Sequence, residues 1–325
     1  MTSIAGSLTV RDLVAALTSA GFPLDLIPPH EIGSAVIDSR QATSGCLFIA
    51  MRGEHHDGHD YVPEALARGA VAVIAERVPP DAPCQALDVR EGAPLQGPEM
   101  LVLPLCLIVN DSLEALQQAA AHWRRQHDVR VIGITGSVGK TTSKEVIAAV
   151  VRQRFCTLRS KGNYNNEIGL PLTLLHLRPD HERVVLEMGM YDLGEIAHLA
   201  RIALPYVGVV TNVEPTHLER LGTIERIAQA KAELPQALPP AKDGGVAILN
   251  ADDEHVRAMA AQTKARIFTY GLTPEADLWA DRIQSKGLKG IHFRFHFGRE
   301  AIYARVPMLG RHSVHTALSA ASVGL

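Results

Sequence analysis

The feature that most constrains the fold of this 325-residue chain is a glycine-rich loop between an apolar strand and a helix. Residues 129–135 are almost continuously apolar, which predicts a strand that is buried on both faces of a parallel sheet. The chain then turns through residues 136–139 (GSVG) into residues 140–154, where apolar side chains recur at helical spacing. Glycines let backbone N–H groups approach an anion, and a helix N-terminus adds a favourable dipole. The sequence therefore predicts a phosphate-binding loop within an α/β fold.

The residues around this loop favour a nucleoside triphosphate as the ligand. Lys140 is placed to neutralise the β- and γ-phosphates, and the Thr141 hydroxyl is placed to ligate Mg²⁺. The strict motif is not met, because Ile134 stands where it has a glycine. A glycine-rich turn without a ligand is the alternative, but strand, GKT and helix coincide here. The other candidate phosphate contacts are Gly136, Ser137, Gly139 and Thr142.

Periodicity predicts two α/β parts joined by a connecting helix over residues 111–127. Residues 1–110 are expected to form a small N-terminal α/β domain, with a loop over residues 78–104. Its expected strands are 35–37, 46–51, 71–74 and 106–109, and its expected helices are 10–19 and 62–68.

Residues 128–325 are expected to form a central domain with a mainly parallel sheet, because apolar strands alternate with helical patterns. After the loop, strands are expected at 184–188, 207–211 and 246–249. The period then changes to two over residues 291–297, which predicts an antiparallel strand paired with residues 301–306. The chain stops within a helical pattern that has no cap, so we expect that it is cut at this point.

Composition excludes several classes of protein. The chain has 32 basic and 35 acidic residues, which argues against a broad nucleic-acid-binding face. No apolar run is long enough to span a membrane, and Arg11 and Asp12 interrupt any signal-peptide pattern. None of the four cysteines belongs to a CxxC pair, so a zinc or disulfide framework is poorly supported. A cytoplasmic protein is the simplest expectation.

Several further segments follow the loop in an order typical of one family. They are GNYNNEIGLPLTLL (162–175), VVLEMG (184–189), TNVEPTHLERLG (211–222), AQAKAEL (228–234) and LNADD (249–253). With these motifs the chain resembles the Mur ligases, ATP-dependent enzymes that build the peptidoglycan precursor. The N-terminal segment that begins DSR (38–62) and the NYNNEIG segment are most similar to the branch that adds D-alanyl-D-alanine to UDP-N-acetylmuramoyl-tripeptide.

The resemblance implies an ATP-dependent acid–D-amino-acid ligase with three domains, of which this chain contains the first two. They would bind the UDP end and ATP, and the absent C-terminal domain would bring the amine. ATP would phosphorylate the tripeptide carboxylate, and D-alanyl-D-alanine would then attack the acyl phosphate. A monomer is expected, because such an enzyme must close its domains around the substrates.

The resemblance also implies a catalytic centre. Glu187 and His217 would hold Mg²⁺ together with Thr141, and Lys140, His217 and Lys231 would be the catalytic residues. Lys231 matches a lysine that family members carbamylate, which requires a neutral amine and therefore a lowered pKa. From the sequence alone, a solvated helix lysine is favoured, and Ala232 beside it stands where glycine is usual.

Substrate contacts are implied for three further groups of residues. Asn250 is assigned to adenine, Ser39 and Arg40 to the UDP moiety, and Asn163, Asn165 and Asn166 to the sugar-peptide substrate. Turn chemistry alone also explains the asparagines. Residues 310–316 resemble a family segment whose two asparagines are here Ser313 and Thr316, which weakens adenine contacts there. A metal site at the loop histidines 55, 56 and 59 is disfavoured, because such residues are usually solvated.

Three alternative functions remain open at this point. A sibling ligase that adds a diamino acid would share the catalytic centre, although the NYNNEIG and DSR segments argue against it. A non-catalytic nucleotide-binding module would not need Lys140, Glu187 and Lys231 together. A phosphate-loop kinase would share the first chemical step but would lack the UDP domain.

Overall fold

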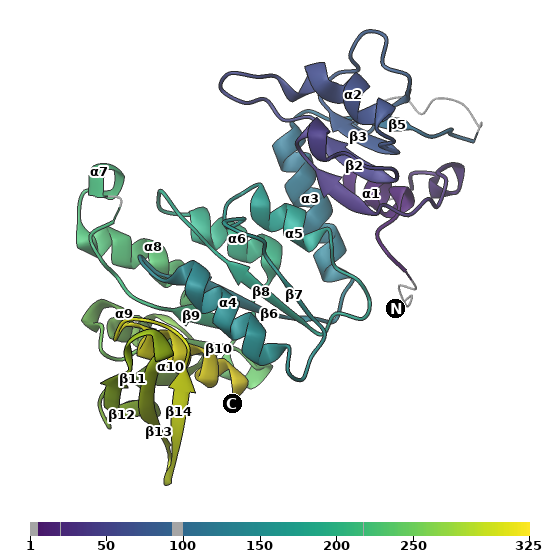
Figure 1. The fold of residues 1–325 in the computed structure, drawn as a ribbon. Helices are drawn as coiled ribbons and strands as arrows, with labels where there is room; N and C mark the ends of the chain where they lie inside the picture. Colours follow the sequence, from purple (N-terminus) through teal and green to yellow (C-terminus); the bar gives the residue numbers. More distant parts are fainter. Residues whose placement is uncertain (1–5, 20, 93–99, 217) are drawn as a thin grey trace. The chain divides into compact units, whose positions relative to one another are not determined.

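The computed structural model describes residues 6–19, 21–92, 100–216 and 218–325, which fold into two compact α/β units (Figure 1). The first unit comprises Met1–Asp128 and Glu167–Asp180, and the second comprises Val129–Asn166 and His181–Leu325. The predicted fold class is confirmed in both units. The division at a connecting helix over residues 111–127 stays a prediction. Within the described ranges, no helix is both long enough and apolar enough to cross a membrane.

The first unit contains a five-stranded parallel sheet in the order β1-β2-β3-β5-β4. Its strands are β1 (Ser34–Val36), β2 (Cys46–Ile49), β3 (Ala72–Ala75), β4 (Gln85–Asp88) and β5 (Leu105–Ile108). Its helices are α1 (Val10–Leu17), α2 (Val62–Ala67), α3 (Ser112–Arg125) and α5 (Gly169–Leu174). Helix α2 packs on one sheet face, and α3 begins where the Asp111 carboxylate accepts from the Leu113 and Glu114 backbone N–H groups.

The prediction of a loop over residues 78–104 is wrong at one place, because β4 lies within it. Only Leu87 of this edge strand is buried, so the strand has no continuous apolar run that periodicity could detect.

The second unit contains a nine-stranded sheet in the order β14-β13-β12-β11-β10-β9-β6-β8-β7. All neighbouring strands pair in parallel, including β11 with β12, except in two antiparallel pairs, β12 with β13 and β13 with β14. The pair of β13 with β14 confirms the predicted hairpin. The strands are β6 (Arg130–Thr135), β7 (Thr157–Arg159), β8 (Arg183–Glu187), β9 (Val207–Val210), β10 (Val246–Asn250), β11 (Arg266–Gly271), β12 (Leu278–Ser285), β13 (Ile291–Phe297) and β14 (Glu300–Val306). Strands β7, β11 and β12 were not anticipated, because polar residues interrupt each of them.

Helices cover both faces of this sheet. They are α4 (Lys140–Val151), α6 (Glu195–Ala203), α7 (Leu218–Leu221), α8 (Ile224–Gln236), α9 (Glu254–Ala258) and α10 (Ser313–Gly324). Helices α4 and α10 pack against each other and share one apolar core with the sheet (Figure 1). Helix α8 approaches the sheet closely, because Gly133 and Gly208 leave room for Leu234. This close approach determines the burial of α8 residues on the same helical face.

Candidate active site

The carboxyl ends of four neighbouring parallel strands bring the candidate residues to one edge of the second sheet. The order β10-β9-β6-β8 places Asn250, Thr211, the phosphate loop and Glu187 after or at the ends of successive strands. Open α/β sheets bind their ligands outside this edge. The structure therefore collects segments that are up to about a hundred residues apart in the sequence into one candidate site.

The phosphate loop ends at the N-terminus of α4, with Gly139 as the residue before the helix. Lys140 Nζ donates to Gly136 O at 2.8 Å and to Ser137 O at 3.1 Å, so the lysine lies over the loop. Burial lowers the pKa of Lys140, and the nearby Glu187 carboxylate opposes that shift. The first-turn N–H groups of a helix have no intrahelical acceptor, which leaves those of Lys140–Thr142 for an anion.

Asn212 supports the phosphate loop from the end of β9, a role that the sequence did not reveal. Its Oδ1 accepts from the Ser137 N–H at 3.0 Å and from the Val138 N–H at 2.9 Å. Ser137 Oγ also donates to Glu214 O at 2.9 Å. The segment 211–222 contains these partners, but no pattern within it shows that β9 is the neighbour of β6.

We expect Gly136→Ala to weaken both folding and nucleotide binding. A Cβ at this position would collide with Thr211 Oγ1, and the backbone φ of +150° disfavours a side chain. Overpacking of this kind costs about 1–3 kcal/mol. Thermal unfolding with and without ATP would measure both effects.

The double variant Gly136→Ala/Thr211→Ala is the matched control for this expectation. It removes the colliding hydroxyl but keeps the unfavourable φ, so it should recover part of the lost stability. Equal stability of the single variant and the wild type would contradict the steric argument.

Glu187 is the centre of the hydrogen-bond network at this edge. Its side chain is only 2% exposed, and its two oxygens accept from Thr141 Oγ1 and from Asn165 Nδ2, both at 2.8 Å. A buried carboxylate is costly unless it is paired or binds a metal. Mg²⁺ prefers oxygen ligands, and the Thr141 hydroxyl and Glu187 carboxylate offer two oxygens close together. The residues present therefore fit a magnesium ion, while its binding here stays a prediction.

Lys231 is buried in α8, which corrects the expectation of a solvated helix lysine. The residue is 2% exposed, and none of the described residues hydrogen-bonds to its Nζ. Burial and repulsion by Lys140 lower the pKa of Lys231 to about 7. A large fraction of the amine is therefore neutral at neutral pH. Ala232 lies within the continuous helix α8, so the replacement of glycine leaves the backbone helical.

The remaining residues expected at this edge differ in their surroundings. Asn163 and Asn166 are exposed in the loop that contains Asn165. Asn250 is 7% exposed, and its amide donates to Thr211 O at 2.8 Å and accepts from the Asp252 N–H at 3.1 Å. Its contact with adenine stays a prediction. His217 lies outside the described residues, so its roles as metal ligand and catalytic residue stay predictions as well.

Ser313 and Thr316, which replace two expected asparagines, are both buried in α10. The Ser313 hydroxyl donates to Leu309 O at 2.7 Å. That bond satisfies the hydroxyl within the protein, so Ser313 offers little to a nucleotide.

In the first unit, Ser39 and Arg40 follow β1 at the carboxyl edge of the sheet. Ser39 is 5% exposed and donates to Glu64 Oε2 at 2.8 Å, whereas the Arg40 side chain is exposed and paired with Asp38. Arg40 is therefore the more accessible of the two for an anionic ligand. Both UDP assignments stay predictions.

His59 is held within the loop that follows β2 by contacts of both ring nitrogens. The imidazole is fully buried, its Nδ1 faces Asp57 Oδ1, and its Nε2 accepts from the Glu76 N–H at 2.9 Å. With both ring nitrogens engaged, His59 has a structural role in the loop.

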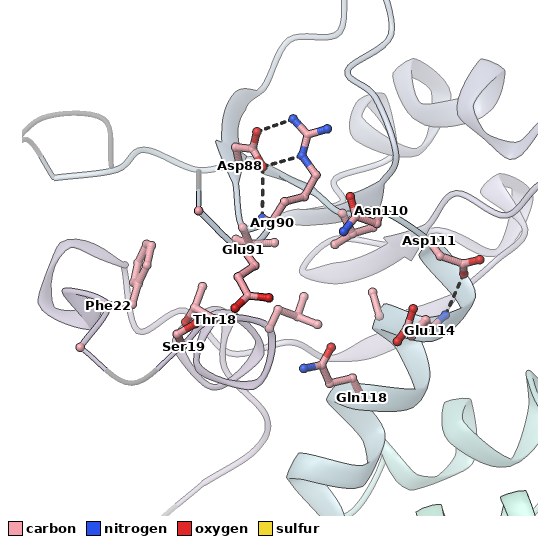
Figure 2. A pocket seen from close by; sticks show the side chains of 16 residues that line it. Thr18, Ser19, Phe22, Asp88, Arg90, Glu91, Asn110, Asp111, Glu114 and Gln118 are labelled. Carbon is pink, nitrogen blue, oxygen red and sulfur yellow. Dashed lines mark hydrogen bonds and ion pairs between the residues drawn. The ribbon is translucent and has the colours of Figure 1, made fainter. Parts of the chain in front are cut away.

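A cavity of about 620 Å³ lies at the carboxyl ends of β4 and β5 in the first unit (Figure 2). It is lined by the end of α1, by residues that follow β4 and by the start of α3. Asp88 and Arg90 pair at its wall, and Glu91 and Glu114 also line it. Strands β2 and β3 separate this cavity from Ser39 and Arg40, which do not line it.

Comparison with known families agrees with this geometry. The family described as Mur ligase middle domain matches residues 134–324, which is more than half of the chain. The chain belongs to the Mur ligase family. A second match, to the family described as Mur ligase family, catalytic domain, covers residues 31–102 of this Mur ligase.

Relatives of known structure and sequence extend this result. A UDP-N-acetylmuramoyl-tripeptide–D-alanyl-D-alanine ligase from Synechocystis is 42% identical over 74% of the chain and 49% of its own length. A crystal structure of MurF from Acinetobacter baumannii aligns with 99% of this chain, and the alignment covers 65% of the MurF chain. The sequence identity is 31% and the TM-score is 0.80. A MurF ligase from Thermotoga maritima in complex with ADP aligns with 89% of this chain, and the alignment covers 62% of the Thermotoga chain. The sequence identity is 27% and the TM-score is 0.72. This Mur ligase thus spans about half to two thirds of the length of those relatives.

Proposed function

We propose that this chain belongs to an ATP-dependent ligase that joins D-alanyl-D-alanine to UDP-N-acetylmuramoyl-tripeptide through an acyl phosphate. The observation that carries the proposal is the convergence of Thr141 and Asn165 on the buried Glu187 carboxylate. Thr141 lies in the first turn of α4, directly after the phosphate loop. Asn165 lies in the loop assigned to the UDP-linked substrate. Their shared partner supports a site where a phosphoryl donor and a carboxylate acceptor meet.

Relatives support the choice of substrates. The Synechocystis relative is named for the addition of D-alanyl-D-alanine to the UDP-N-acetylmuramoyl-tripeptide, and the Thermotoga relative binds ADP. We extend both properties to this chain. The reaction would take place in the cytoplasm, where ATP and a UDP-linked precursor are available, and a monomer would perform it.

Different residues of the second unit would have different roles in phosphoryl transfer. Lys140 would hold the β- and γ-phosphates and limit the repulsion between ATP and the tripeptide carboxylate. Mg²⁺, held by Thr141 and Glu187, would add positive charge at the same phosphates. A carbamate on Lys231 would supply an anion at this edge, and His217 would act as a further ligand. Water must be excluded, because it would hydrolyse the acyl phosphate.

Oxygen isotope transfer tests the chemical step. The tripeptide carboxylate oxygen would attack the γ-phosphorus, and ADP would leave. The neutral D-alanyl-D-alanine amine would then attack the carbonyl carbon, phosphate would leave, and the nitrogen would release one proton. With ¹⁸O in the terminal carboxylate of the tripeptide, we expect one labelled oxygen in the released phosphate, measured by mass spectrometry. Pentapeptide formation and phosphate release should both require D-alanyl-D-alanine.

Other outcomes separate the alternatives. Phosphate release with a diamino acid and the matching shorter precursor would indicate a sibling ligase. Phosphate release that ignores both co-substrates would indicate another NTPase. Binding of ATP without any turnover would favour a nucleotide-binding module.

A further inference from the structure

Lys144 is a fully buried lysine that the phosphate chemistry does not use. It lies one helical turn after Lys140 on α4, and its side chain has no solvent exposure. Burying an ammonium group costs free energy unless the group is paired and hydrogen-bonded. An apolar side chain of similar length would fill this position at lower cost. Its cation therefore requires an explanation beyond packing.

The partners of Lys144 connect the nucleotide helix to the substrate loop. Its Nζ donates to Gly162 O at 2.7 Å and lies 3.3 Å from Glu145 Oε1. Glu145 also accepts from Arg159 at 2.8 Å, just before that loop. Gly162 is the first residue of the GNYNN segment, so Lys144 holds one end of the loop.

The other end of this loop is held by β8. Asn165 Nδ2 donates to Glu187 Oε1, and Asn165 O accepts from the Gly189 N–H at 2.8 Å. Glu187 in turn accepts from Thr141 of α4. Both ends of the loop are thus tied to α4, directly through Lys144 and through the Glu187 carboxylate that accepts from Thr141.

We propose that Lys144 is a positioning residue that fixes the Gly162–Asn165 loop, and with it the UDP-linked substrate, relative to the phosphate loop. This inference rests on the proposed function for the identity of the substrate. Its structural part, the anchoring of the loop, does not depend on turnover. Lys144 acts through Gly162 and touches neither substrate.

The test compares Lys144→Met with the wild type and with Lys242→Met, which removes an exposed lysine in residues 241–243. In Lys144→Met we expect kcat/KM for UDP-N-acetylmuramoyl-tripeptide to fall about 10²-fold, while ATP affinity changes less than about threefold. The unfolding temperature should change little, because Gly162 is exposed, so its freed carbonyl can be solvated, and Glu145 keeps its pair with Arg159. Lys144→Arg, which keeps the charge and the donor, should recover part of the activity.

Hydrogen exchange without any substrate gives the second readout. The Tyr164 and Asn165 amides, which donate to Lys161 O and Asn163 O, should exchange about tenfold faster in Lys144→Met. If Lys144→Met does not fold, Lys144→Gln replaces it with the same expected directions. If the wild type does not bind the precursor, the proposed function is wrong. The exchange rates of the two amides, compared between the wild type and Lys144→Met, still test whether Lys144 anchors the loop.

Two results would overturn the proposal. Unchanged exchange of both amides would show that the loop does not depend on Lys144. An equal loss of affinity for ATP and for the precursor, with lower thermal stability, would assign Lys144 a general structural role.

Discussion

Lys140→Met is expected to lower ATP-dependent phosphate release by about 10³-fold or more, while the fold is retained. The ammonium group of Lys140 lies over the loop at 2.8 Å from Gly136 O and 3.1 Å from Ser137 O. The ammonium group therefore lies beside the loop at which the phosphates of ATP are expected to bind. Without this cation, the negative charge that develops on the transferred phosphoryl group loses its nearest positive partner.

The measurement is phosphate release under saturating substrates, together with thermal unfolding of the free protein. The loop carbonyls freed by the substitution can be solvated, so a stability loss of only about 1 kcal/mol is expected. Lys242→Met, an exposed substitution of the same kind, serves as the control and should keep full activity. Retention of activity within tenfold in Lys140→Met would place the ATP site elsewhere.

Lys231→Met is expected to lower the rate about 10²-fold, and the wild-type rate should depend on dissolved CO₂. Lys231 would form a carbamate only as the neutral amine, which would attack CO₂ and release one proton. With a pKa of about 7, the neutral fraction falls about tenfold for each pH unit below 7. Activity in CO₂-depleted buffer should therefore fall most steeply below pH 7 and return on addition of bicarbonate.

The pH dependence of folding stability provides a control, because its direction follows from the same lowered pKa of Lys231. Burial lowers the folded-state pKa of Lys231, so the unfolded chain binds a proton more readily above pH 7. In CO₂-free buffer the wild type should gain stability as pH rises from about 7 toward the ordinary pKa of lysine, and Lys231→Met should not show this gain. If the rate does not depend on CO₂ and the Lys231→Met variant is active, a carbamate at this position is excluded.

Local patterns predicted most of the second unit correctly. The apolar run before the GSVG loop became β6, the helical spacing after it became α4, and the period-two segment became β13. These elements are governed by short-range chemistry, since backbone conformation and hydrophobic period act over a few residues. Strand β12 escaped notice because Asp281 and Arg282 interrupt its apolar character.

Burial could not be inferred for the residues whose chemistry depends on it. Lys231 lies beside Glu233 in a helix, a pattern typical of a solvated face. Helix α8 nevertheless buries it, because the glycines of β6 and β9 let that helix approach the sheet. The burial of His59 could not be inferred either, because it lies in a loop rich in polar residues and is nevertheless fully buried.

The sequence by itself determined which chemical groups end each strand: the loop with Lys140 after β6, Glu187 in β8 and Asn212 after β9. Only the tertiary structure decided which of these groups are neighbours. Because parallel strands need not pair in chain order, the placement of β6 between β9 and β8 brings Asn212 and Glu187 to opposite sides of one phosphate loop. Strand order arises from long-range packing of helices on the sheet, and no local pattern of residues encodes it.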